Sequence, residues 1–210
     1  TVPASFLGAP EVSALNMLAE EINAAGGIDG NKIELIIKDS GASPEKAISF
    51  ANQLIEEEKV FTIIGPSTSG ESLKIKKLCQ SARVILIPCA SAELIVNPVA
   101  SYVFKTAPSD SLAAHQIFMT MNKMGISKIA VVTGNTGFGK AGKQQLTKIA
   151  PEYKIDIVDS EVYDKAANDL SALVAKLKSN ADVQAVVNWS VVPAQSIIAK
   201  NMRQAGWDVP

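Results

Sequence analysis

The stretch Ile63 to Ser72, IIGPSTSGES, is the most informative segment of the sequence. A β-branched apolar run from Val60 to Ile64 ends there in a turn rich in glycine and hydroxyl residues, and a helical pattern follows. Such a turn presents free backbone N–H groups at a helix N-terminus, where the peptide dipoles favour an anion. The hydroxyls of Ser67, Thr68 and Ser69 can add further donors, so we expect a polar binding socket here.

A second turn of the same kind follows the next expected strand. Residues 84–87 run into PCASAE at positions 88–93. Because neighbouring parallel strands end at the same edge of a sheet, where open α/β sheets bind ligands, we expect Cys89, Ala90 and Ser91 to join the socket. Hydroxyl and N–H groups suit a carboxylate, and backbone carbonyls at Cys89 or Ala90 suit an amine. The alternative is that the hydroxyls serve only as helix N-caps.

Helical and strand periodicities alternate along the rest of the chain. Helices are expected at residues 11–25, 44–57, 69–81, 110–124, 138–149, 169–178 and 193–205, and strands at 32–39, 60–64, 84–87, 102–105, 128–133, 155–162 and 183–188. This order predicts an α/β fold of two doubly wound lobes with parallel sheets. Residues 1–105 form the first, ligand-binding lobe and residues 106–210 a partial second lobe, and we expect the fold to be incomplete at both ends.

Composition and charge exclude several classes of protein. An apolar content of 47% with 20% charged residues is ample for buried cores, and a net charge of −1 without a basic face argues against nucleic acid as a partner. No apolar run approaches the roughly 20 residues of a membrane span. The strand expected between Cys79 and Cys89 separates them by more than the ~7 Å that a disulfide allows, which predicts two free thiols.

The loop from Thr133 to Gly142, TGNTGFGKAG, matches two nucleotide-binding patterns. The first, G-x-x-x-x-G-K, fails at Ala141, where a hydroxyl should hold Mg²⁺. The second, G-x-G-x-x-G, needs an acid about 20 residues on, and Asp156 and Asp159 are only loosely placed for it. A tight turn between strand and helix is the favoured interpretation, and a nucleotide-binding enzyme that uses this loop ranks third among the functional hypotheses.

Signals for catalysis or metal binding are weak elsewhere. The single histidine, His115, lies on an expected helix with no nucleophile motif near it, so we interpret it as structural. No Cys/His pair has the spacing of zinc ligands, and no cluster of carboxylates surrounds a glycine loop. We therefore predict no catalytic residue, no metal and no cofactor.

Seven segments share their order and spacing with a known family. They are EEINAAGGIDGNKIELIIKDS at 20–40, SPEKAISFANQLI at 43–55, IIGPSTSG at 63–70, PCASAEL at 88–94, FKTAPSD at 104–110, GFGKAG at 137–142 and VPAQSIIAKNMRQAG at 192–206. Together they resemble the branched-chain amino-acid binding proteins, which are periplasmic solute receptors of ABC importers with the type I binding-protein fold. The resemblance covers nearly the whole chain.

The resemblance implies two lobes that close about a hinge over a solute, without covalent chemistry. Ser69 falls on the family's serine for the ligand carboxylate, Cys89 on a backbone contact, and Ser91 on a hydroxyl that meets the polar head of the ligand. Thr68 and Ala90 lie in the same two turns and complete the expected contacts of the first lobe.

Three further positions match aromatic residues of the family. Phe138 falls where the family often has a tyrosine, Val192 falls near a second tyrosine, and Leu7 matches a third aromatic position. Because the alignment near Val192 can shift by a residue or two, Trp189 is an alternative pocket residue. The loss of tyrosine hydroxyls makes the pocket more apolar than that of a plain leucine, isoleucine or valine receptor.

The function implied is an extracytoplasmic, monomeric receptor of an ABC importer. Its ligand would be a small amino acid of the branched-chain type, or a related carboxylate with an apolar or aromatic body, and its protein partner an ABC permease at the membrane. The resemblance implies no enzymatic activity. The alternative within the same fold is a ligand-sensing regulatory module that controls a signalling partner.

Overall fold

The computed structural model describes residues 4–210, in which helices and strands alternate along most of the chain. The helices are α1 (Ser5–Ala24), α2 (Pro44–Glu56), α3 (Ser69–Ala82), α4 (Asp110–Lys123), α5 (Gly137–Ile149), α6 (Ser171–Ser179) and α7 (Gln195–Gln204), with short 3₁₀ helices η1 (Glu93–Ile95) and η2 (Ala150–Tyr153). The strands are β1 (Thr62–Ile64), β2 (Ile85–Ile87), β3 (Lys128–Gly134), β4 (Asp156–Tyr163) and β5 (Ala185–Trp189).

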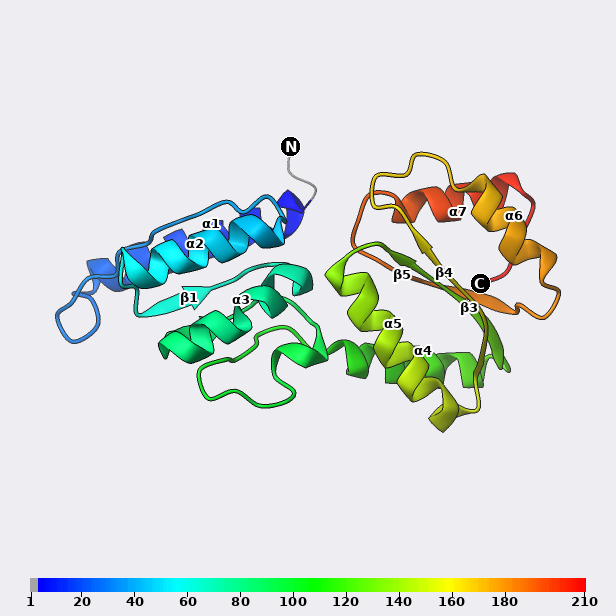
Figure 1. The fold of residues 1–210 in the computed structure, drawn as a ribbon, viewed down its shortest axis with the longest axis horizontal. Coiled ribbons are helices and arrows are strands. Elements are labelled where there is room, and N and C mark those ends of the chain that lie inside the picture. Colours follow the sequence, from blue (N-terminus) through cyan, green and yellow to red (C-terminus); the bar gives the residue numbers. More distant parts are fainter. Residues whose placement is uncertain (1–3) are drawn as a thin grey trace.

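The strands form two separate parallel sheets, one of β1 and β2 and the other in the order β4-β3-β5. In Figure 1, the elements up to η1 gather around the first sheet and those from α4 onward gather around the second. The α/β fold with parallel sheets is confirmed. The division of the chain between residues 105 and 106 stays a prediction.

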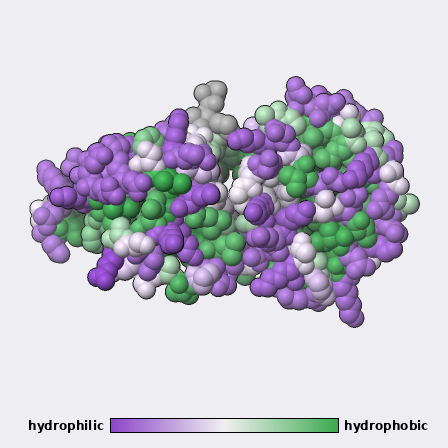
Figure 2. Space-filling model, in the orientation of Figure 1, coloured by the Kyte–Doolittle hydropathy of each residue, from purple (hydrophilic) through white to green (hydrophobic). Residues whose placement is uncertain are grey.

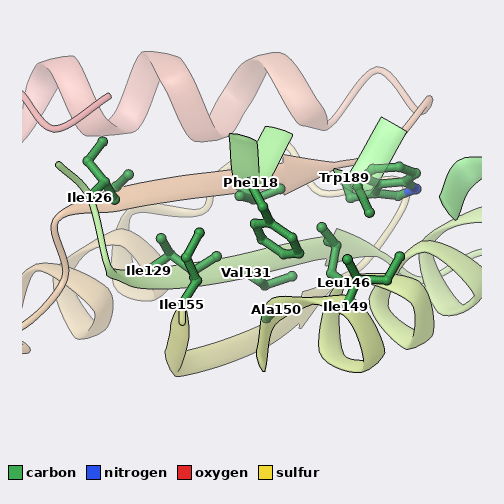
Figure 3. Close-up of a cluster of buried hydrophobic side chains, with 12 residues drawn as sticks. Phe118, Ile126, Ile129, Val131, Leu146, Ile149, Ala150, Ile155 and Trp189 are labelled. Carbon is green, nitrogen blue, oxygen red and sulfur yellow. The ribbon is translucent and has the colours of Figure 1, made fainter. Parts of the chain in front are cut away.

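The central strand of the second sheet explains its layering. Successive residues of a strand point to opposite faces, and β3 is buried on both. Ile129 and Val131 pack in one cluster with residues of α4 and α5, while Ala130 and Val132 pack in another with residues of α6 and α7. Figure 3 shows Phe118 of α4 among the side chains of the first of these clusters. Helices therefore cover both faces of this sheet.

The first sheet has a smaller core, in which α2 and α3 pack together against Ile63 of β1 and Leu86 of β2. Ser43 caps α2, because its side chain accepts a hydrogen bond from the Lys46 N–H at 3.3 Å. Helix α1 begins earlier than expected and buries only Ala19. Leu15 and Ile22 of this helix are half-buried, and Leu18 is 46% exposed.

The strand expected at residues 32–39 does not form in the structure. A strand is defined by a paired neighbour, and no other part of residues 4–210 pairs with this extended segment. The segment is held instead by Asn23 of α1, whose side chain donates to the Ile33 carbonyl at 2.8 Å and accepts from the Ile33 N–H at 2.7 Å. At 102–105 the expected strand is reduced to a single parallel bridge between Val103 and Leu86.

Both cysteines are free thiols, as the sequence predicts. Burial raises the pKa of the Cys79 thiol to about 11, so this group stays protonated at neutral pH. Within the described part of the chain, no helix combines the length and hydrophobicity that crossing a membrane requires.

Candidate functional site

A cavity of about 490 Å³ lies where the first 105 residues meet the second sheet. Its volume falls in the range of about 300–1,000 Å³ that is typical of small-molecule sites. It is lined by Ser91, Pro108, Ser109, Asp110, Leu112, Ala113, Phe138, Asn188, Trp189 and Ser190. Only Ser91 comes from the N-terminal half of the chain, so the cavity joins residues from both halves.

An aromatic pair forms one wall of this cavity. Phe138 lies in the first turn of α5, directly after β3, and Trp189 is the last residue of β5. Because β3 and β5 are paired in parallel, both residues reach the carboxyl edge of the same sheet. The two rings stack with centroids 5.5 Å apart and an interplanar angle of 27°. This wall suits an apolar or aromatic ligand body.

The polar side of the cavity is formed by Ser109 and Asp110. They belong to the crossing segment, residues 105–110, which runs from the first half to the start of α4. The Asp110 N–H donates to the Ser91 carbonyl at 2.9 Å. The Lys105 ammonium donates to the same carbonyl at 3.0 Å and to Ser109 Oγ at 2.6 Å. Ser109 occupies the N-cap position of α4 but makes no side-chain cap hydrogen bond. Charge-assisted donation from Lys105 engages this oxygen instead.

The charged groups of this crossing influence one another's ionisation. Burial raises the pKa of Asp110, while the neighbouring Lys105 opposes that change. Burial lowers the pKa of Lys105. A hydrogen bond from the Ser109 hydroxyl holds the pKa of Glu93 below its usual value. Lys105 and Asp110 of the crossing segment therefore lie near Glu93 of η1, which places two acids and one lysine at the polar side of the cavity.

The hydroxyls of the first turn already have partners inside the protein. Ser67 Oγ donates to Glu11 of α1 at 2.6 Å, and Thr68 Oγ1 donates to Glu71 at 2.5 Å. These carboxylates are stronger acceptors than neutral oxygens, which explains why the hydroxyls turn toward them. Glu11 lies 56 residues from Ser67 along the chain, so local spacing does not predict this contact.

The remaining predicted residues of the first half do not line the cavity. Ser69 is 2% exposed, and its Oγ accepts a hydrogen bond from the Ala92 N–H at 3.3 Å. The Cys89 N–H donates to the Pro66 carbonyl at 3.2 Å, and Ala90 is buried in the core of the first sheet. Their roles as ligand contacts stay predictions.

Leu7 and Val192 are also not among the residues that line the cavity. Leu7 is half-buried near the start of α1. Val192 is buried in the cluster that α6 and α7 form on the opposite face of the second sheet. Of the predicted site residues, the cavity therefore brings together Ser91, Phe138 and Trp189.

Several cavity residues were not predicted, and Asp110 is the most consequential of them. The position of Asp110 in the sequence indicates such a role, because a segment that connects two lobes must border the space between them. Asn188 and Ser190, which flank Trp189, follow from the same logic at the end of β5.

The glycine-rich loop before α5 is used for close packing. A Cβ on Gly139 would lie 2.1 Å from the Gly134 carbonyl oxygen, and one on Gly142 would lie 2.0 Å from Trp189 Nε1. These contacts account for the glycines as packing positions in a tight turn. His115, likewise, has a structural setting, since its Nδ1 lies 3.0 Å from the Tyr153 hydroxyl.

A second cavity, of about 420 Å³, lies between α4 and β5 and is almost entirely apolar. Its lining residues are Ala113, Gln116, Ile117, Thr120, Met121, Met124, Ile126, Ala185, Val186 and Pro210. All of these belong to the C-terminal half. Figure 2 shows that hydrophobic residues also reach the surface in both halves. Across residues 4–210, no group of three acidic, histidine or cysteine side chains is placed to hold a metal.

Comparison with known families gives one match over residues 1–210, to a family described as periplasmic binding protein. Among curated relatives, an amino acid binding protein of Pseudomonas aeruginosa is 27% identical over 90% of this chain and 50% of its own length. The leucine-, isoleucine-, valine-, threonine- and alanine-binding protein of the same species is 25% identical over 99% of this chain and 56% of its own length. The chain thus spans about half the length of these relatives.

Solved structures share the fold. A type 1 periplasmic binding protein from Bordetella pertussis has a TM-score of 0.91 at 24% identity, covering 100% of this chain and 58% of that one. A solute-binding protein of an ABC transporter from Rhodopseudomonas palustris, solved with 3,4-dihydroxybenzoic acid, has a TM-score of 0.79 at 24% identity, covering 98% and 56%. A substrate-binding protein of an ABC transporter from Desulfitobacterium hafniense, solved with leucine, has a TM-score of 0.73 at 21% identity, covering 93% and 59%.

Proposed function

This chain belongs to the periplasmic binding protein family, and on that premise we propose that it forms the ligand-binding part of a solute receptor for an ABC importer. The family is one of binding proteins rather than enzymes. The receptor works outside the cytoplasm, in agreement with the family's description as periplasmic. It acts as a monomer. The receptor then binds its solute, closes over it and releases it, without any covalent step.

One observation carries the proposal: the cavity of about 490 Å³ joins Ser91 from the first half to Phe138 and Trp189 from the second. A ligand held there touches both halves at once. Because such a ligand binds the closed arrangement better than an open one, it shifts the equilibrium toward closure. The closed form is the one that a membrane permease would recognise.

The lining of the cavity suggests the class of ligand. The stacked rings of Phe138 and Trp189 suit an apolar or aromatic body, and Ser91, Ser109 and Asp110 supply polar groups on the other side. A small amino acid or an aromatic carboxylate meets both requirements. Leucine and 3,4-dihydroxybenzoate, the ligands in two structures with this fold, are the first compounds to test.

A thermal-shift screen of amino acids and aromatic carboxylates on the full-length protein tests this function. Calorimetry on the compounds that stabilise the protein should then show that Phe138→Ala weakens binding by about tenfold, since burial of an aromatic side chain contributes about 1.5–3 kcal/mol. Phe61→Ala is the matched control, because Phe61 is 83% exposed and is not a cavity residue. Equal affinities for the wild type and Phe138→Ala would contradict the proposed site.

A further inference from the structure

Asp110 is fixed between the two halves of the molecule by its own hydrogen bonds. It is the first residue of α4, it is 2% exposed, and it is one of the residues that line the cavity described above. Its N–H donates to the Ser91 carbonyl, and its Oδ1 accepts from the Glu93 N–H at 2.9 Å. The bond from Glu93 holds Oδ1 of the carboxylate, and the bond to Ser91 fixes the backbone at the start of α4.

The second carboxylate oxygen of Asp110 lacks a partner. Oδ2 is buried and accepts no hydrogen bond from any group in residues 4–210. Buried polar oxygens are almost always hydrogen-bonded, because an unsatisfied one costs about 1–3 kcal/mol and a charged one costs more. Because Asp110 is one of the residues that line the cavity, a ligand that fills the cavity can supply the missing donor.

The neighbouring lysine does not supply that donor. The Lys105 ammonium is directed to the Ser91 carbonyl and to Ser109 Oγ. The ion pairs found in the described residues do not include Lys105 with Asp110. Glu93 adds a second negative charge beside the same lysine, so the crossing segment has one excess negative charge. This balance favours a donor, and a cationic one in particular.

We propose that Asp110 Oδ2 accepts a hydrogen bond from an N–H or O–H group of the ligand, which makes Asp110 a specificity-determining residue of the cavity. The inference rests on the proposed function. The ligand class follows from the geometry: a small carboxylate whose apolar or aromatic body lies near Phe138 and Trp189 and which presents a donor toward α4. An ammonium group and a ring hydroxyl both provide this chemistry.

Two pairs of compounds separate these donors in the full-length protein. Leucine and 4-methylpentanoate differ by the ammonium group, and 3,4-dihydroxybenzoate and benzoate differ by the ring hydroxyls. By calorimetry, the wild type should bind the donor-bearing member of at least one pair at least about tenfold more tightly than its partner, since hydrogen bonds to charged groups are strong. The pair that shows the preference identifies the donor.

Asp110→Asn is the decisive variant because it keeps the shape of the side chain. Its carbonyl oxygen can still accept from the Glu93 N–H, which places the NH₂ group where Oδ2 was and presents a donor to the ligand's donor. We expect this variant to lose about tenfold or more in affinity for the donor-bearing compound and to bind the donor-free one as before. Asp156→Asn, at an exposed acid of β4, is the control and should change neither affinity.

The outcomes distinguish the inference from the function on which it rests. Binding with a preference that Asp110→Asn leaves intact overturns the role of Asp110 and spares the receptor. A wild type that binds both members of each pair equally also overturns that role. Binding of none of the four compounds rejects the proposed ligand classes and the inference together.

Discussion

Replacing Gly137 with alanine is expected to hold the two halves of the protein apart and to weaken ligand binding by at least about tenfold. Gly137 is the first residue of α5, and the N-terminus of this helix meets the N-terminus of α3 between the halves (Figure 1). A Cβ at this position would lie 2.3 Å from Gly70 Cα and 2.8 Å from Gly70 N. Backbone atoms cannot rotate away as a side chain can, so the helices must separate.

Calorimetry and small-angle scattering on the full-length protein measure the two parts of this prediction. Gly137→Ala should lower affinity and reduce the compaction that ligand causes in the wild type. Gly70→Ala is a control at the same contact, because its Cβ would lie 3.5 Å from the nearest Gly137 atoms, an ordinary van der Waals distance. Wild-type affinity in Gly137→Ala would mean that the approach of α3 to α5 has no part in binding.

The second large effect is expected from Gly142→Ala, which should destabilise the protein by about 1–3 kcal/mol, the usual cost of overpacking a core. The added Cβ would lie 2.0 Å from Trp189 Nε1 and 2.3 Å from two further indole atoms. The indole is 7% exposed, stacks on Phe138 and lies at one end of the cluster in Figure 3. A rigid ring in this position can only be displaced as a whole.

Urea unfolding monitored by circular dichroism measures this loss. Lys140→Ala, two residues earlier on the same helix, is the control, because Lys140 is exposed and its removal should alter neither stability nor ligand affinity. The comparison also separates the two interpretations of the glycine-rich loop. A stable Gly142→Ala together with an impaired Lys140→Ala would favour a phosphate-binding loop over a packing turn.

The sequence predicted most elements of the second half closely, for physical reasons visible at β3 and α5. The strand expected at residues 128–133 is β3, Lys128–Gly134, and the helix expected at 138–149 is α5, Gly137–Ile149. Both have strong local signals. The strand is a short apolar run rich in β-branched residues, and the helix has an apolar stripe with a bounded start. The apolar run of β3 agrees with its burial on both faces.

The errors arose where structure depends on distant partners. Residues 32–39 have the pattern of a strand, but a ladder needs a neighbour, and here two hydrogen bonds with Asn23 of α1 hold the segment. The hydroxyls of Ser67 and Thr68 looked free because their carboxylate partners could not be foreseen from spacing. The orphan oxygen of Asp110 is likewise a property of packing in three dimensions, which no local motif encodes.

A crystal structure of the full-length protein with a compound from the screen would show where the ligand binds. The compound should lie in the cavity bounded by Ser91, Asp110, Phe138 and Trp189, with contacts to both halves of the chain. A compound bound instead in the apolar cavity between α4 and β5, with the first cavity empty, would contradict it.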